Sequence, residues 1–299
     1  MKLRPSHVLA SMAGGAATAL AFPKADVFLA AWFGLIPLLF ALAGKTPGRA
    51  FLVGGAGGAA FYAVLLYWIP AVPAHYGNLP GAVSFLIYLF LVLLLASTWA
   101  LFGFAFAVVG RRFPLGAFYA APFIWVGQEY LVTHLLTGFP WGILGLSQTK
   151  DLALLQVSAV TGVYGVSFVL VLFQALFVAS VRFQKRLPFA AGLLVLALVH
   201  AGGFAGLRTV QPNGESFRAA VIQGNVSSDI YWNEVGTEVI LQLFDEHVDL
   251  TRQASDRGAR LVVWPEFTVP LCFDCGEPLY RSFAGRLQEF VRETGTTLL

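Results

Sequence analysis

The segment LVVWPEFTVP, residues 261–270, places a carboxylate, Glu266, directly after a run of apolar residues. The run RLVVW (260–264) is typical of a strand buried on both faces, and Pro265 ends its ladder because proline has no backbone donor. Open α/β sheets hold their sites at the carboxyl ends of strands. A partly desolvated glutamate there would have the raised pKa that a general base needs. The alternative is a carboxylate that caps a turn or pairs with an arginine.

The two cysteines, Cys272 and Cys275, follow Glu266 closely and are spaced C-x-x-C. Three interpretations stay open: a disulfide, a zinc site, and two free thiols in a loop over the site. A single C-x-x-C without a second ligand pair is weak support for zinc. The histidines His75, His134 and His200 share no helical spacing, so they do not indicate a metal site either. We expect no metal and no cofactor.

Two features of the apolar part also invite functional interpretations. Glu129 falls inside or at the edge of an apolar segment, where an ionisable side chain usually has a partner or a task. The alternative is an interfacial carboxylate that reaches headgroup depth. The glycine-rich run VGGAGGAAF (53–61) lacks the Lys-Ser/Thr ending of a phosphate-binding loop. Gly54 and Gly58 therefore predict close packing between helices.

The segment TGFPWGILGLSQ (137–148) is apolar but interrupted by glycines and a proline. Such a segment is not a simple connector, and we expect it at the outer membrane interface with Trp141 at headgroup depth. Two interpretations remain open, an ordinary aromatic belt and a lipid-facing outer loop formed by Phe139, Pro140 and Trp141.

The composition indicates which elements must position these residues. The chain has 299 residues, 58% of them hydrophobic and 12% charged, with a mean hydropathy of +0.73. These values exclude an ordinary soluble protein and indicate a membrane protein. Residues 1–207 hold three acids, whereas residues 208–299 hold thirteen acids, eight arginines and no lysine. The chain therefore divides into a membrane domain (1–207) and a polar tail (208–299).

Seven segments are apolar and long enough to be membrane spans, since a bilayer core needs about 20 apolar residues per helix. The first is short and follows Lys2 and Arg4, so a cleaved signal peptide is the alternative, although an uncleaved helix is favoured. The expected spans are 8–22, 26–43, 50–69, 82–109, 114–133, 152–181 and 188–206.

The charges of the connections predict the orientation, because lysine and arginine are retained on the cytoplasmic side. Alternate connections hold nine basic residues, whereas the intervening ones hold Lys24 and Lys150, each beside an aspartate. The N-terminus is therefore expected in the cytoplasm and the tail outside, in the periplasm of a Gram-negative cell. The basic residues are Lys2, Arg4, Lys45, Arg49, Arg111, Arg112, Arg182, Lys185 and Arg186.

The tail alternates strand and helix patterns. The runs AAVIQ (219–223) and RLVVW predict strands, and TTLL at the chain end predicts the start of a third. Apolar residues at helical spacing predict helices over 235–257, with Gly258 as its stop, and over 279–293. This is the beginning of an α/β domain, and we expect the chain to be the N-terminal portion of a longer protein.

Taken together, the apolar N-terminal part, GFPWGILGLSQ, AVIQGNVSSDIYWNE and LVVWPEFTVP resemble the apolipoprotein N-acyltransferase family, colinearly over essentially the whole chain. The resemblance implies a membrane α-helical bundle followed by an extracytoplasmic α/β nitrilase-like (α-β-β-α sandwich) domain, incomplete here, in the bacterial inner membrane. It also implies an acyl transfer from a phospholipid, usually phosphatidylethanolamine, through a cysteine thioester. The acceptor is the amine of the diacylglyceryl cysteine of an apolipoprotein. No nucleic-acid partner is expected.

The resemblance further implies roles for residues. The family's triad is Glu, Lys and Cys, and Glu266 matches the glutamate, the general base. Trp232 matches an active-site tryptophan. No lysine follows Lys185, and Cys272-Phe273-Asp274 imitates the nucleophile signature but has no strand leading into it. The chain alone is therefore expected to be inactive.

Two rival functions differ in class. A membrane-anchored nitrilase-type amidase would use the same base and nucleophile with water as acceptor, but it would not need the apolar outer loop. A scaffold or transporter would not depend on Glu266 at all.

Overall fold

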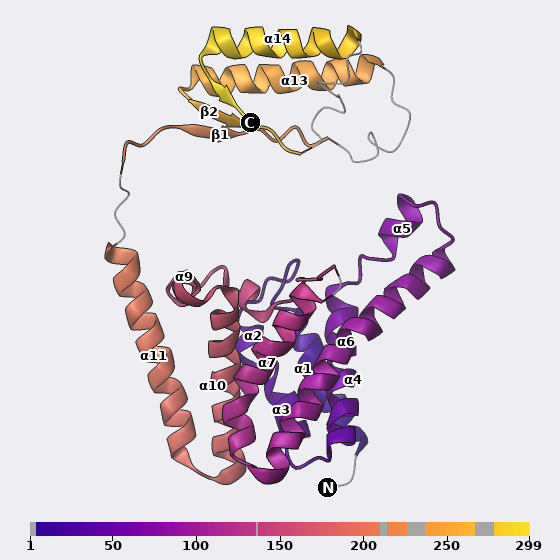
Figure 1. The fold of residues 1–299 in the computed structure, drawn as a ribbon, viewed down its shortest axis with the longest axis vertical. Coiled ribbons are helices and arrows are strands. Elements are labelled where there is room, and N and C mark those ends of the chain that lie inside the picture. Colours follow the sequence, from indigo (N-terminus) through magenta and orange to yellow (C-terminus); the bar gives the residue numbers. More distant parts are fainter. Residues whose placement is uncertain (1–3, 136, 210–213, 227–236, 267–277) are drawn as a thin grey trace. The chain divides into compact units, whose positions relative to one another are not determined.

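The computed structural model describes residues 4–135, 137–209, 214–226, 237–266 and 278–299. The chain divides into two compact units, Met1–Gln211 and Pro212–Leu299. The first unit is helical, and the second combines helices with a small sheet (Figure 1).

The first unit is a bundle that combines long helices with short ones. Its elements are α1 (Pro5–Ala19), α2 (Ala30–Phe33), α3 (Ile36–Leu42), α4 (Pro47–Leu65), α5 (Ala71–His75), α6 (Gly81–Arg112), α7 (Gly116–His134), the 3-10 helix η1 (Leu144–Gln148), α8 (Leu152–Leu155), α9 (Ser158–Thr161), α10 (Val163–Phe183) and α11 (Arg186–Thr209).

Within the described residues, four helices are long and apolar enough to cross a membrane: α4, α6, α10 and α11. The chain is therefore a membrane protein by the length and composition of its helices. The other three expected spans correspond to α1, to the pair α2 and α3, and to α7, which contains Gln128, Glu129 and His134.

Two of the expected spans are interrupted in the structure. Residues 152–161 form α8 and α9, and α10 begins only after Gly162, whose φ of +65° ends the preceding turn. The segment 26–43 is interrupted between α2 and α3. There the Gln174 side chain accepts a hydrogen bond from Leu35 N at 2.8 Å and donates one to Ala31 O at 3.0 Å. A buried side chain thus satisfies the backbone groups that the break leaves open, as an apolar environment requires.

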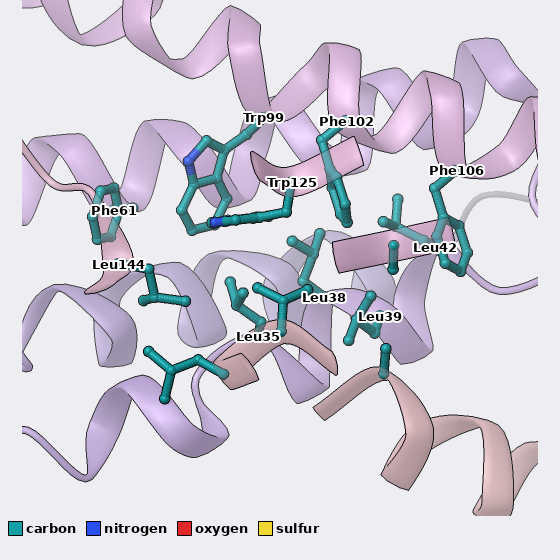
Figure 2. Packing of buried hydrophobic residues seen from close by; sticks show 14 of the residues in the cluster. Leu35, Leu38, Leu39, Leu42, Phe61, Trp99, Phe102, Phe106, Trp125 and Leu144 are labelled. Atoms are coloured by element: carbon teal, nitrogen blue, oxygen red, sulfur yellow. The ribbon is translucent and has the colours of Figure 1, made fainter. Parts of the chain in front are cut away.

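The core of the bundle is rich in aromatic rings (Figure 2). Phe61 stacks on Trp99 with ring centroids 4.9 Å apart, and Trp99 meets Trp125 edge to face at the same distance. Phe102 packs against Trp125 at 5.1 Å. Edge-to-face and offset pairs of this kind stabilise beyond the area they bury, so this row of rings fixes α4, α6 and α7 against one another.

The glycines of the run 53–61 lie inside α4, where they let neighbouring helices approach closely. A Cβ at Gly54 would lie 2.3 Å from the carbonyl oxygen of Trp99, and one at Gly58 would lie 2.8 Å from Trp99 Cβ. The run is therefore a helix-packing face, as the sequence predicted, and not a phosphate-binding loop.

We expect Gly54→Ala to destabilise the bundle by about 1–3 kcal/mol, because the added methyl group would collide with backbone. Gly55→Ala is the matched control, since its Cβ would meet Ala100 Cβ at an ordinary 3.4 Å. The measurement is the midpoint of thermal unfolding in detergent. Equal midpoints for the two variants would show that the close contact between α4 and α6 does not limit stability.

The second unit contains β1 (Ala219–Val221), α13 (Thr237–Asp256), β2 (Leu261–Val263), α14 (Pro278–Thr294) and β3 (Thr297–Leu298). The strands are parallel in the order β1-β2-β3, with Ala220 opposite Val262 and Val262 opposite Leu298. Gly258, with φ +85°, follows the end of α13. The predicted alternation of strands and helices in the tail is confirmed.

One prediction about β2 is wrong. Val262 is fully buried with Ile222 and Ala259, but Leu261 and Val263, on the opposite face, are only half-buried. Both α13 and α14 lie on the same side of the sheet (Figure 1), as successive crossovers of one hand require in a 1-2-3 strand order. The described helices therefore cover one face, and Val221 on the other is 78% exposed.

Candidate functional site

Glu266 lies in the turn that follows the middle strand β2. The strand ends as the sequence predicted: Trp264 N still donates to Leu299 O at 2.8 Å, and the next residue is Pro265. On the other side, Ile222 N donates to Val263 O at 2.9 Å. Glu266 is therefore at the carboxyl edge of a parallel sheet, with the end of β1 alongside. Its side chain is exposed. The described residues therefore do not give Glu266 the partial burial that the sequence predicts.

Side chains of α13 hold the end of β2, just before Glu266. Trp264 Nε1 donates to Thr251 Oγ1 at 2.8 Å, and Thr251 Oγ1 donates to His247 O at 2.7 Å. The His247 ring lies edge-on to Trp264, with centroids 5.3 Å apart. A Cβ at Gly224 would lie 2.3 Å from that ring. A side chain at residue 224 would therefore require the histidine ring to shift, whereas glycine lets the turn after β1 pass close to it.

His247 is a buried residue that the sequence reasoning missed. Its Nδ1 lies 2.7 Å from Leu243 O and must donate, because a carbonyl only accepts. Its Nε2 is buried and has no hydrogen-bond partner within the described ranges. The signal was present: His247 follows Leu243 by four residues and Phe244 by three, which places it on the apolar face of the helix.

The other predicted residues of the tail site cannot be located. Trp232, Cys272 and Cys275 lie outside the described residues. Elsewhere, His134 Nδ1 contacts Tyr130 O, and His200 Nε2 contacts Asp151 Oδ2, each at 2.9 Å. In the part of the chain that the structure describes, no group of three or more His, Cys, Asp or Glu residues could hold a metal ion.

Residues 137–148, which the sequence predicts on the outer side and which we call the outer loop, begin with a reversal at Gly138, where φ is +75°. Phe139 N donates to Val132 O at 2.8 Å, which folds the loop back on the end of α7. Beyond it, the Trp141 ring lies 5.3 Å from Phe139 and 4.8 Å from Trp68. Trp141 is nevertheless 47% exposed, so the loop presents an aromatic surface.

Glu129 anchors the second half of this loop. Its Oε1 accepts a hydrogen bond from Leu144 N at 2.8 Å and one from Trp125 Nε1 at 2.9 Å. Glu129 is only 4% exposed, so the alternative of an interfacial carboxylate is wrong. The carboxyl group instead joins α7, the start of η1 and the aromatic core.

Two further buried side chains hold the loop. Gly145 N donates to Ser167 Oγ of α10 at 2.8 Å. Gln148 accepts from Trp32 Nε1 at 2.9 Å and donates to Phe28 O at 3.0 Å. The end of the outer loop is thus bonded to α7, α10 and the start of the α2 region, which makes it a fixed part of the bundle.

An apolar groove opens beside the first half of the loop. A cavity of about 220 Å³ lies between α6 and α7, and leucines make up half of its lining residues. Gly138 and Phe139 of the loop also line it. The groove can receive a hydrocarbon chain, because its lining offers apolar contact and few polar groups.

Comparison with known proteins identifies the family. The family model described as apolipoprotein N-acyltransferase N-terminal domain matches residues 14–176. A protein of Geobacter metallireducens named apolipoprotein N-acyltransferase is 36% identical, over 96% of this chain and 55% of its own length. Proteins with that name from Azotobacter vinelandii and Photobacterium profundum are 32% and 28% identical, over 99% and 98% of this chain and 56% and 55% of their own lengths. The chain spans about half the length of the curated relatives it matches. It belongs to the apolipoprotein N-acyltransferase family.

Proposed function

We propose that this chain provides the membrane part and the general base of an enzyme that acylates the N-terminal amine of bacterial apolipoproteins. The observation that carries the proposal is the position of Glu266, at the carboxyl end of the middle strand of a parallel sheet. The first unit adds a helical bundle that has an anchored aromatic loop and an apolar groove. Membership in the family supports the same assignment.

The proposed reaction has two steps that share one base. Glu266 takes the proton of a cysteine thiol, the thiolate attacks the ester carbonyl of a phospholipid, and the lysophospholipid leaves with a proton as a thioester forms. The amine of the diacylglyceryl cysteine then attacks the thioester. Glu266 accepts a proton from that amine, the amide bond forms, and the thiol is released. A lysine would stabilise the oxyanion of each step.

We assign neither the nucleophilic cysteine nor that lysine to residues 1–299. No lysine follows Lys185. Cys272 stays unassigned, since the family resemblance places the nucleophile at a strand-to-helix turn, and no strand pattern leads into Cys272. Trp232 is proposed as a wall of the acyl site.

The outer loop and the groove are proposed to handle the lipid. Trp141 and the partly buried Phe139, with Pro140 between them, form an aromatic surface at the mouth of the groove between α6 and α7. An acyl chain of the phospholipid donor, phosphatidylethanolamine, would enter this groove. Aromatic side chains favour headgroup depth, so the loop would hold the donor's ester near the membrane surface.

We propose that the first unit crosses the bacterial inner membrane seven times, with α1, the pair α2 and α3, and α7 as further spans. The basic residues support a cytoplasmic N-terminus and a periplasmic tail, because they are concentrated in alternate connections. At the other end, Lys150 is paired with Asp26 at 2.5 Å, which reduces the net charge that faces outward.

The second unit is proposed to be the beginning of a nitrilase-like α-β-β-α sandwich. The uncovered face of its sheet supports this, since Val221 and Leu299 are each 78% exposed. Parallel sheets are normally covered on both faces, and in that sandwich a second sheet would cover this one.

The test is an acyl-transfer assay on the full-length protein in proteoliposomes of phosphatidylethanolamine, with a synthetic diacylglyceryl-cysteine peptide as acceptor. We expect mass spectrometry to show the peptide gain one acyl chain in an amide bond as lysophosphatidylethanolamine appears. Release of free fatty acid without any acylated peptide would contradict the proposal and favour the membrane-anchored hydrolase.

A further inference from the structure

A cavity of about 370 Å³ opens at the end of the bundle opposite the outer loop. It lies where α3, α6 and α10 end and α7 begins, and its floor is apolar, with Phe106 and Phe118 in edge-to-face contact at 5.1 Å. Three cations line it: Lys45, Arg111 and Arg182. None of its described lining residues is acidic.

Lys45 is the least exposed of these cations, at 4%. Its Nζ lies 3.0 Å from Nδ1 of His7, which can accept a hydrogen bond but supplies no negative charge when neutral. Burial lowers the pKa of Lys45, and the nearby charges of Arg4 and Arg49 lower it further. A buried ammonium group in such a setting is costly unless an anion compensates it.

The described residues give the two arginines no counter-charge either. Among the described residues, neither Arg111 nor Arg182 forms an ion pair. Arg111 is in the last turn of α6 and Arg182 in the last turn of α10, so the two guanidinium groups come from different helices to one cavity. Guanidinium groups match the oxygen atoms of phosphate well.

We propose that this cavity binds the phosphate group of a phospholipid with net negative charge, such as phosphatidylglycerol, with part of its hydrocarbon on the apolar floor. Basic pockets between membrane helices on the cytoplasmic side are suited to anionic headgroups. The volume is within the range of small-molecule sites. A zwitterionic headgroup fits less well, because its own cation would meet three protein cations.

The site differs from the proposed acyl-donor groove in place and in lipid class. The groove lies beside the outer loop and would take phosphatidylethanolamine, whereas the cavity lies at the basic end of the bundle. Binding at the cavity therefore does not depend on the acyltransferase assignment, and either proposal can fail alone.

The experiment measures lipid retention by the full-length protein. Protein reconstituted in nanodiscs of equal parts phosphatidylglycerol and phosphatidylcholine is extracted in mild detergent, and the lipids that remain bound are quantified by mass spectrometry. We expect selective retention of phosphatidylglycerol by the wild type. The double variant Arg111→Gln/Arg182→Gln should lose that retention by about tenfold, since two charge-assisted contacts are removed.

The matched control is Arg112→Gln, which removes an exposed arginine next to Arg111 that does not line the cavity. It should retain phosphatidylglycerol like the wild type. The charge-preserving variant Arg111→Lys/Arg182→Lys should retain most of the lipid, and each single Gln variant should give an intermediate loss if the double variant does not fold.

Three results would overturn the proposal. The first is equal retention of the two lipids by the wild type, and the second is equal loss in the Arg112→Gln control. The third concerns free phosphate: millimolar inorganic phosphate that displaces the lipid and stabilises the protein as much as phosphatidylglycerol does would assign the cavity to a soluble anion.

Discussion

Replacing Glu266 by glutamine in the full-length protein is expected to lower acyl transfer by roughly 10²–10⁴-fold, the usual contribution of a general base. The amide has nearly the shape of the carboxyl group but cannot accept the proton of a thiol or an amine. Glu266 lies exposed in the turn after β2, so the exchange should leave folding unchanged. The measurement combines the transfer assay with thermal unfolding of the same preparation.

Glu289→Gln is the matched control for this experiment, because it makes the same chemical change on the exposed surface of α14. It should transfer acyl chains at the wild-type rate. Retained transfer by Glu266→Gln would remove the base from the mechanism.

The second large effect is expected at Glu129. In Glu129→Leu, Leu144 N and Trp125 Nε1 lose their shared acceptor inside the bundle. A buried donor left unsatisfied costs about 1–3 kcal/mol, so the two together should cost roughly 2–6 kcal/mol. Glu129→Gln keeps an oxygen in the same place and should cost much less.

The measurements for Glu129 are the unfolding midpoint in detergent and the rate of proteolysis within residues 137–148. The Leu variant should unfold earlier and be cut faster in the outer loop, and glutamine should restore both. Ser167→Ala, which removes the acceptor of Gly145 N, should have a smaller effect of the same kind. If leucine and glutamine behaved alike, the carboxyl oxygen would not be what holds the loop.

The order of strands and helices in the tail was predictable because it depends on patterns within short stretches of sequence. Short apolar runs and apolar residues at helical spacing, with glycine after each helix, are enough to give the five elements of the second unit in order. What the pattern could not give is which faces are covered. The apolar run at β2 suggests burial on both sides, but coverage depends on where the crossovers place α13 and α14, and the strand itself does not encode that.

The bundle was predictable in composition but not in detail. Hydropathy detects apolar length, so it gives the long helices and misses the breaks. The gap between α2 and α3 is possible because Gln174, far along the chain, bonds to Ala31 and Leu35. In the second unit, the close approach of Gly224 to His247 likewise joins residues that are distant in sequence. Partners that are distant in sequence leave no periodic signal.

Of the candidate site, the sequence predicted the position of Glu266 but not the residues that support it. Glu266 was placed at a strand end from the proline that follows LVVW, and the structure describes it there. The support beneath it, from Trp264 through Thr251 to His247, was not foreseen. These contacts depend on how α13 packs on the sheet.

The hydrogen bond between Trp125 and Glu129 makes one indole an optical reporter of the outer loop. Trp125 is buried among aromatic rings, and its Nε1 shares an acceptor with Leu144 N. Unseating the loop would change the polarity around this ring and the orientation of its dipole. Residues 1–299 contain seven tryptophans, so a variant in which the other six are replaced should have an emission wavelength that follows the loop without any added label.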